Sequence, residues 1–236
     1  MASTHLLSAF DEELQYLMRR ISEMGGMAEQ MVADSVKALV NTDAALAQKV
    51  ISDDVVMDAA ELDIGEKAVI VIARRQPVAA DLREIIGALR IASDLERVGD
   101  MGKNNAKRVM AVQGTGVPRK LARGLEHLSE LALLQLKEVL DVYSTRSAEK
   151  AKSIRDRDEE IDAMYTSLFR ELLTYMMEDP RNITTCTHLL FCAKNIERVG
   201  DHATNIAETI YYMTTGAPPE GERPKEDLTS SFGAEE

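Results

Sequence analysis

Hydrophobic residues follow a helical pattern along almost the whole of this 236-residue chain. Apolar positions recur three and four residues apart, and no segment alternates convincingly between apolar and polar residues as a half-buried strand does. The pattern predicts an all-α fold of six long helices. The predicted helices cover residues 5–41, 43–75, 79–112, 118–145, 147–179 and 181–215.

Residues that favour caps and turns separate these helices. Residues 41–43 (NTD) and 145–147 (TRS) carry side chains that cap helices, and Pro77 and Pro180 lie in the second and fifth connections. The sequence QGTGVP at residues 113–118 is the only internal stretch that resembles a linker. From residue 216 the chain is polar and rich in Pro and Gly, which predicts a disordered tail.

The six helices form two groups of three because the sequence repeats itself. The pentapeptide ERVGD occurs at residues 96–100 and 197–201, and aligning residues 91–108 with 192–209 gives eight identities in eighteen positions. Upstream, the Asp-x-x-x-Asp motif that begins at Asp54 recurs at Asp158, an offset of 104 rather than 101. The sequence therefore predicts two tandem three-helix bundles, residues 1–112 and 113–215, followed by the tail at 216–236.

Acids four residues apart on a helix usually form only a solvated face, but the repeat gives these acids a defined geometry. If the second and third helices form an antiparallel hairpin that turns at Pro77, residues whose numbers sum to 154 lie at equal height. Asp58 then faces Glu96, and Asp54 faces Asp100. The same rule pairs the apolar residues Leu62 with Ala92 and Val69 with Ile85, so the acids are expected to continue the line along which the two helices pack.

The second unit repeats the arrangement with a sum of 359. Asp162 faces Glu197, Asp158 faces Asp201, and Phe169 faces Leu190. Two hairpins thus each predict a cluster of four carboxylates. The predicted metal-ligating residues are Asp54, Asp58, Glu96, Asp100, Asp158, Asp162, Glu197 and Asp201.

Four carboxylates so placed repel one another, and three solutions are open. Some carboxylates can take up protons through raised pKa values, Arg97 and Arg198 can pair with them in a purely structural salt-bridged cluster, or a polyvalent cation can bind. Facing helices commonly hold metals through carboxylates, and an all-oxygen ligand set suits Mg, Mn, Ca or oxidised Fe. Metal binding is the favoured interpretation and the salt-bridged cluster is the main alternative.

The residues around the acids have plainer interpretations. Asn104 and Asn205, one turn beyond the acids, fit hydrogen bonding between helices better than support of a metal ligand, and His202 fits a surface residue. Gly99 and Gly200 interrupt helices, where Gly costs about 1 kcal/mol relative to Ala. They indicate either a close helix approach or ligand access beside the acids.

Charge and composition exclude several functions. The net charge of −12 argues against a surface that binds nucleic acid or anionic membrane. The two cysteines form neither a CxxC pair nor a disulfide framework, and neither a signal peptide nor a membrane-spanning run is present, so a cytoplasmic protein is expected.

The sequence indicates a protein that is not an enzyme. It has no phosphate-binding Gly loop and no convincing Ser/His/Asp or Cys/His constellation. The alternative is a di-metal, carboxylate-bridged helical-bundle enzyme. Such sites usually add Glu-x-x-His motifs, and neither ERVGD helix has one.

The same motifs carry a family resemblance. The paired sequences DVVMD…ERVGD and DEEID…ERVGD, together with ARRQP at residues 73–77, YMMEDPR at 175–181 and EMGGMAEQ at 23–30, resemble the PhoU family of bacterial regulators associated with phosphate-specific transport. The resemblance extends to about residue 215.

This resemblance implies a cytoplasmic protein of two similar three-helix bundles, often a homodimer. It implies negative regulation of the phosphate-starvation response and of phosphate uptake, through contacts with the ATPase of the phosphate importer and with the phosphate-sensing histidine kinase. It also implies multinuclear clusters of iron or zinc on the paired acid motifs, while manganese and magnesium are further candidates from the oxygen ligand set.

Overall fold

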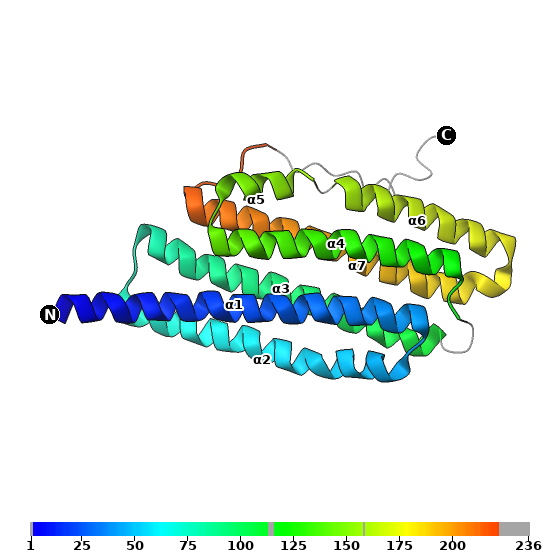
Figure 1. The fold of residues 1–236 in the computed structure, drawn as a ribbon, viewed down its shortest axis with the longest axis horizontal. Coiled ribbons are helices and arrows are strands. Elements are labelled where there is room, and N and C mark those ends of the chain that lie inside the picture. Colours follow the sequence, from blue (N-terminus) through cyan, green and yellow to red (C-terminus); the bar gives the residue numbers. More distant parts are fainter. Residues whose placement is uncertain (1, 113–115, 158, 222–236) are drawn as a thin grey trace.

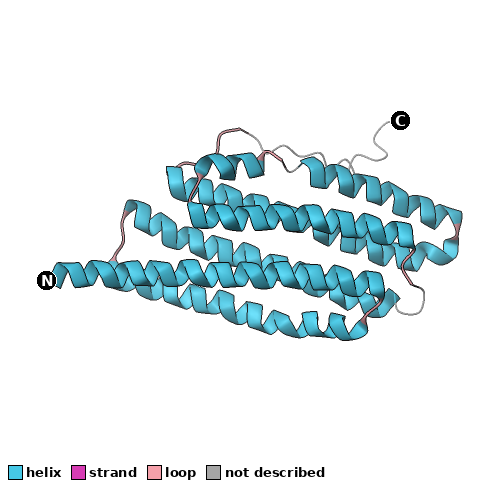
Figure 2. Ribbon diagram, viewed as in Figure 1, coloured by secondary structure: helices cyan, strands magenta, loops and turns pink. Residues whose placement is uncertain are grey.

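A computed structural model describes residues 2–112, 116–157 and 159–221, and these residues form helices and connecting loops only (Figure 2). The first bundle contains α1 (Ala2–Asn41), α2 (Ala44–Arg75) and α3 (Ala79–Val112). The second contains α4 (Arg119–Thr145), α5 (Ala148–Arg155), α6 (Glu159–Glu178), a short 3-10 helix (Pro180–Asn182) and α7 (Ile183–Thr215). The all-α fold of two tandem bundles is confirmed.

The two bundles lie side by side with their long axes roughly aligned (Figure 1). They meet mainly where α3 packs against α7, with a smaller contact between α1 and α4. The helices α3 and α7 run in opposite directions, so the start of one packs beside the end of the other, and Asp94 lies opposite His202 while Asn105 lies opposite Asn195. Buried apolar residues from both bundles form one continuous core.

The predicted caps fix the ends of several helices. The carboxylate of Asp43 accepts hydrogen bonds from the backbone N–H groups of Ala45 and Leu46, both at 3.0 Å, and so begins α2. The hydroxyl of Ser147 accepts from the backbone of Lys150 at 3.3 Å and begins α5.

The prediction of one continuous helix over residues 147–179 was wrong, because α5 ends at Arg155 and α6 begins at Glu159. Basic residues occupy the last turn of α5 and acidic residues the first turn of α6, which favours a helix end followed by a helix start. Arg155 also holds the break in place. Its guanidinium is buried, with hydrogen bonds to Glu208 Oε1 at 2.9 Å and to the carbonyl oxygen of Gly221 at 2.7 Å.

Two sequence predictions fall partly outside the described residues. Residues 113–115 of the predicted linker and residues 222–236 of the predicted disordered tail are not among them. The described start of the tail follows Gly216, whose left-handed backbone ends α7.

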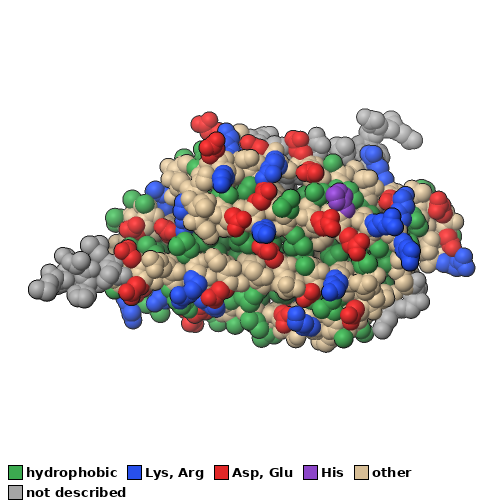
Figure 3. Space-filling view, in the orientation of Figure 1, with side chains coloured by type: hydrophobic (Ala, Val, Ile, Leu, Met, Phe, Trp, Pro, Cys, Tyr) green, Lys and Arg blue, Asp and Glu red, His purple; other side chains and the backbone are tan. Residues whose placement is uncertain are grey.

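The surface and the cysteines limit the chemistry. Acidic and basic side chains are interspersed on the face seen in Figure 3. No helix in the described part of the chain is long and apolar enough to cross a membrane. Cys186 and Cys192 are free and buried, and burial raises the pKa of both thiols, that of Cys192 to about 12. Both therefore stay protonated at neutral pH.

Candidate functional site

The acids of the first repeat lie along the junction of α2 and α3. Asp54 is buried, with 7% of its surface exposed, whereas Asp58 is exposed, and Glu96 and Asp100 are half-buried. Lys103, one turn beyond ERVGD on α3, places its Nζ atom 2.6 Å from Asp54 Oδ2 and 2.6 Å from Asp100 Oδ1. The ammonium thus joins the two helices through both carboxylates.

The charges of this cluster are closely coupled. Burial lowers the pKa of Lys103, but its hydrogen bonds to Asp100 and Asp54 outweigh this effect and raise the pKa overall. Burial raises the pKa of Glu96, and the nearby charges of Asp100, Glu61 and Asp58 raise it further against the opposing effect of Arg97. The acids of both helices therefore share one electrostatic environment.

The predicted packing line was wrong in part. Leu62 and Val69 are each 64% exposed, although their predicted partners Ala92 and Ile85 are buried. The helix α2 packs against α1 as well as α3, so its buried stripe points between those two helices. This rotation leaves Asp58, Leu62 and Val69 along an open edge of the α2–α3 junction. The buried stripe of α2 consists of Ala47, Val50, Asp54, Met57, Ala60, Ile64, Ala68 and Val71.

The acids of the second repeat are more deeply buried. Asp162 on α6 and Glu197 on α7 are 4% and 5% exposed, and Asp201 is half-buried. Lys194 donates to Glu197 Oε1 at 3.0 Å from one turn before ERVGD. Asp158, the fourth predicted ligand, lies outside the described residues.

Glu197 has a perturbed carboxyl. Its pKa is raised to about 7, first by burial and then by the charge of Asp201, while the hydrogen bond and charge of Lys194 act in the opposite direction. The charge of Asp162 also raises this pKa. Since Asp162 lies on α6 and Asp201 on α7, the structure brings both helices' acids around Glu197, as the repeat predicted.

The principal counter-ions are lysines that the sequence reasoning did not single out. Arg97 Nε lies 3.5 Å from Glu96 Oε2 and Arg97 Nη1 lies 3.8 Å from Asp100 Oδ2, and the arginine side chain is 57% exposed. Lys103 and Lys194 approach the buried carboxylates more closely. Their spacing of three residues from Asp100 and Glu197 on the same helix was the available signal.

The donor atoms fit a hard cation, although no complete site is formed. Among the described residues, which lack Asp158, no group of three or more His, Cys, Asp or Glu side chains is arranged to hold a metal. Asp54 Oδ1 and Glu197 Oε2 are nevertheless buried without a hydrogen-bond partner in the described structure. Each repeat thus has one buried carboxylate oxygen that can accept a cation, but at non-equivalent positions, because Asp54 corresponds to Asp158 and Glu197 corresponds to Glu96. In the first repeat the Lys103 ammonium supplies positive charge beside Asp54.

The glycines of ERVGD serve close helix packing. A Cβ atom at Gly200 would lie 2.8 Å from Ile161 Cδ1, and one at Gly99 would lie 3.1 Å from Met57 Cγ. Both contacts join the ERVGD helix to the preceding helix of its hairpin. Of the two explanations that the sequence offered, the structure supports the close approach.

The polar residues beyond the acids connect the two bundles. Asp94 on α3 accepts hydrogen bonds from His202 Nδ1 at 2.9 Å, in the tautomer that protonates this atom, and from Asn205 Nδ2 at 3.5 Å. On the opposite side, Asn195 of α7 donates to Asn105 of α3 at 2.9 Å. Interhelical hydrogen bonding by Asn205 is confirmed. The interpretation of His202 as a surface residue was wrong, because its side chain is only 15% exposed and contacts Asp94 across the bundle interface.

Comparison with known proteins identifies a matching family model and closely similar sequences. The family model described as "PhoU domain" matches residues 21–109 and again residues 125–210. The phosphate-specific transport system accessory protein PhoU homolog of Rhizobium meliloti is 78% identical over 234 residues, covering 99% of each chain. The homolog of the same name from Caulobacter vibrioides strain NA1000 is 46% identical, covering 96% of this chain and 98% of its own.

Two solved structures share the fold. The crystal structure of PhoU from Pseudomonas aeruginosa superimposes with a TM-score of 0.84 at 36% identity, over 88% of this chain and all of that one. The phosphate transport system regulatory protein PhoU from Streptococcus pneumoniae gives a TM-score of 0.82 at 28% identity, over 89% of this chain and 99% of its own.

Proposed function

Because the chain belongs to the PhoU family, we propose that it is a metal-binding adaptor that represses the phosphate-starvation response and phosphate uptake. It links the ATPase of a phosphate importer to a phosphate-sensing histidine kinase. On this proposal the protein acts in the cytoplasm as a homodimer and is not an enzyme. The names of its relatives, accessory protein of the phosphate-specific transport system, support the connection to transport.

One observation carries the metal-binding part of the proposal. Each repeat buries a carboxylate oxygen without a hydrogen-bond partner in the described structure, Asp54 Oδ1 in the first and Glu197 Oε2 in the second. A buried acceptor without a donor is unfavourable unless a proton or cation satisfies it. Asp54, Asp58, Glu96 and Asp100 would hold iron, zinc, manganese or magnesium in the first repeat. Asp158, Asp162, Glu197 and Asp201 would do so in the second.

A bound cation would supply positive charge to both acid clusters. The chain's own residues already set the geometry: ERVGD fixes the acids of α3 and α7, and the close packing at Gly99 and Gly200 holds them against the preceding helix. The adaptor function then depends on a stable pair of bundle surfaces that the importer ATPase and the kinase contact.

The experiment measures metal content by elemental mass spectrometry. The protein as purified is compared with a Glu96→Ala, Asp100→Ala, Glu197→Ala, Asp201→Ala variant, and both are checked for helical content by circular dichroism. A Glu126→Ala, Glu130→Ala variant serves as the matched control, because this exposed pair on α4 has the same four-residue spacing. We expect stoichiometric metal in the wild type and the control only.

A second measurement separates metal binding from adaptor function. Binding of the importer ATPase subunit and of the kinase's cytoplasmic region is measured with metal and with chelator. Tighter binding with metal supports the whole proposal. Equal binding by the metal-free acid variant would remove the metal from the mechanism, and failure to bind either partner would contradict the adaptor function.

A further inference from the structure

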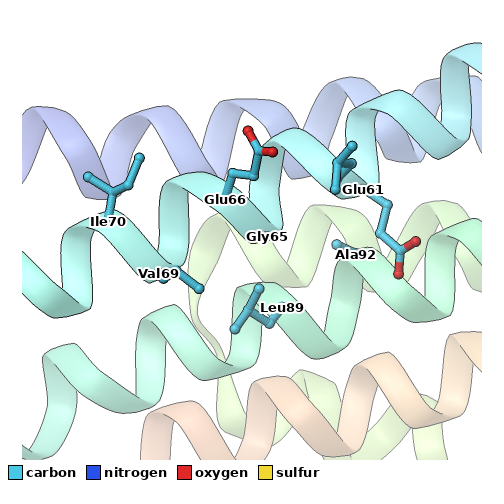
Figure 4. A pocket seen from close by; sticks show the side chains of 8 residues that line it. Glu61, Gly65, Glu66, Val69, Ile70, Leu89 and Ala92 are labelled. Carbon is cyan, nitrogen blue, oxygen red and sulfur yellow. The ribbon is translucent and has the colours of Figure 1, made fainter.

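A groove with apolar walls opens between α2 and α3, beyond the acids of the first repeat. It encloses about 690 Å³ and is lined by Leu62, Gly65, Val69 and Leu89, with Glu61 and Glu66 at its edges. Figure 4 shows Val69 and Leu89 directed toward each other across the groove and the carboxylate of Glu61 extending beside Ala92. Leu62 and Val69 are each 64% exposed, so apolar surface faces solvent here.

The second repeat fills the corresponding place with its own aromatic side chains. The offset of 104 that matches Asp58 with Asp162 also matches Gly65 with Phe169 and Glu61 with Tyr165. Tyr165 is 4% exposed, Phe169 packs against the core, and the two ring centroids lie 6.3 Å apart. The first repeat thus lacks the two aromatic side chains that cover this part of the helical hairpin in the second.

Gly65 leaves room for an aromatic ring. A Cβ atom added at this position would meet nothing within 4 Å apart from its own helix, whereas one at Gly200 would meet Ile161 at 2.8 Å. Close helix packing therefore does not explain Gly65. The open position and the exposed Leu62 and Val69 together form a surface that an aromatic side chain from another molecule can cover.

The charge around the groove selects the kind of partner. Two acidic residues, Glu61 and Glu66, line it. Two basic residues of α2, Lys67 and Arg75, are directed toward α1 instead, since both pair with Glu13. A second copy of this face would bring acids against acids, so a segment that carries Lys or Arg fits better.

From these observations, we propose that the α2–α3 groove docks a segment of a partner protein that inserts a Phe or Tyr side chain flanked by Lys or Arg. The aromatic ring takes the place that Phe169 occupies in the second repeat, and the basic residues pair with Glu61 and Glu66. This proposal rests on the proposed adaptor function in one respect only: it assumes that the molecule bound in the groove is a protein. Peptide binding can be measured without the importer or the kinase, so its failure would leave the adaptor proposal standing.

The test uses the full chain and a synthetic peptide of twelve residues composed of Lys, Ala and Ser around one Phe. The control peptide has Ala in place of that Phe. We expect the methyl NMR signals of Leu62, Val69 and Leu89 to shift with the Phe peptide, and binding to weaken as salt rises. Equal shifts with the Ala peptide, or shifts confined to other residues, would overturn the proposal.

Two variants at one position isolate the groove. Gly65→Phe copies the second repeat and should weaken binding of the Phe peptide at least tenfold, whereas Gly65→Ala adds only a methyl group and should change it less than twofold. Circular dichroism checks that both are folded, and the uncharged Val69→Gln at an exposed position replaces Gly65→Phe if that variant unfolds. Unchanged affinity in the folded plugged variant contradicts the proposal.

Other occupants give different results in the same protein. Tighter peptide binding after Phe232→Ala would identify the chain's own C-terminal segment as the occupant and overturn the partner proposal. A dimer in sedimentation velocity that Gly65→Phe dissociates would instead identify a second copy, with the same consequence.

Discussion

The negative charges of the Asp54 and Glu197 carboxylates are compensated in two different ways. Both carboxylates are buried, and both have one oxygen without a hydrogen-bond partner in the described structure. Asp54 keeps a lysine 2.6 Å away, whereas the pKa of Glu197 is raised to about 7, mainly by burial, despite Lys194 at 3.0 Å. In the second repeat, a proton bound to Glu197 therefore neutralises part of the negative charge near neutral pH.

This difference predicts a pH dependence of stability in metal-free protein. Folded Glu197 holds its proton up to about pH 7, whereas the unfolded residue releases it near 4.5, so the folded state binds more protons between these values. Stability should fall as pH rises through this window, by on the order of 2 kcal/mol. Urea unfolding in EDTA at pH 5 and pH 8 measures the loss. Glu197→Gln should reduce the pH dependence, and the exposed Glu126→Gln should not; an equal dependence in all three proteins would contradict the assignment.

The lysine of the first repeat gives a second prediction. Replacing Lys103 with Met leaves Asp54 buried beside Asp100 without its counter-ion, and should destabilise metal-free protein by about 1–3 kcal/mol in urea unfolding. The exposed Lys107→Met on the same helix should change stability by less than about 0.5 kcal/mol. If cation and ammonium compete, calorimetry should show tighter Mn²⁺ binding by Lys103→Met. Weaker Mn²⁺ binding would show that they do not compete.

For individual residues, the sequence predicted which acids come together but not which side chains are their counter-ions. The repeated ERVGD identified Glu96, Asp100, Glu197 and Asp201, because a shared motif requires a shared environment. Which lysine reaches them depends on the rotation of each helix about its axis. That rotation is set by packing against α1 and α4, which a pairwise rule for one hairpin does not contain.

Among the helices, the closeness of approach is controlled by glycine. A Cβ atom at Gly102 of α3 would lie 3.0 Å from the backbone carbon and 3.1 Å from the carbonyl oxygen of Met31 on α1. Backbone atoms of a packed helix yield less readily than a side-chain end. The distance between α1 and α3 therefore depends on the absence of a side chain at this position.

Two Gly→Ala substitutions should have opposite effects. Gly102→Ala forces α1 and α3 apart and should destabilise the protein by about 1–3 kcal/mol. Gly26→Ala on α1, where a Cβ atom meets nothing within 4 Å, should stabilise it by about 0.5–1 kcal/mol through helix propensity alone. Thermal unfolding of the two variants measures both signs, and stabilisation by Gly102→Ala would show that the helices adjust without strain.

Helix boundaries were predictable where the chain carries a specific signal. Asp43, Ser147 and Pro180 mark ends by capping or by the missing N–H group, and the structure confirms these ends. The break between α5 and α6 has neither Gly nor Pro at residues 153–160, so periodicity alone ran through it. Its signal is the change from basic to acidic residues, supported by the tertiary contacts of Arg155.

For the molecule as a whole, the shared core couples the two bundles. Apolar residues of α3 and α7 pack against each other and make the cores of the two bundles continuous. Each bundle is a structural repeat, but its stability depends on the other through this interface.

We therefore expect one cooperative unfolding transition. The calorimetric and van't Hoff enthalpies of unfolding should agree. Leu17→Ala in α1 and Leu125→Ala in α4 should each reduce the free energy of unfolding by about 2–5 kcal/mol. Each variant should therefore lower the midpoint temperature of the same single transition. Both leucines are fully buried, which makes them matched probes of the two bundles. Two separate transitions, each shifted by only one variant, would show that the bundles unfold independently.

The hydrogen bonds between α3 and α7 have a consequence for how the duplicated halves recognise each other. Asp94 corresponds to Asn195, and Met101 corresponds to His202, under the offset of 101. The contact of Asp94 with His202 consequently occurs on one side of the interface and has no equivalent on the other. Two copies of the first half would place Asp94 near a methionine, and two copies of the second would contain no aspartate at this position. The duplicated chain thus encodes a heterologous joint, in which each half is complementary to its sequence-diverged neighbour rather than to itself.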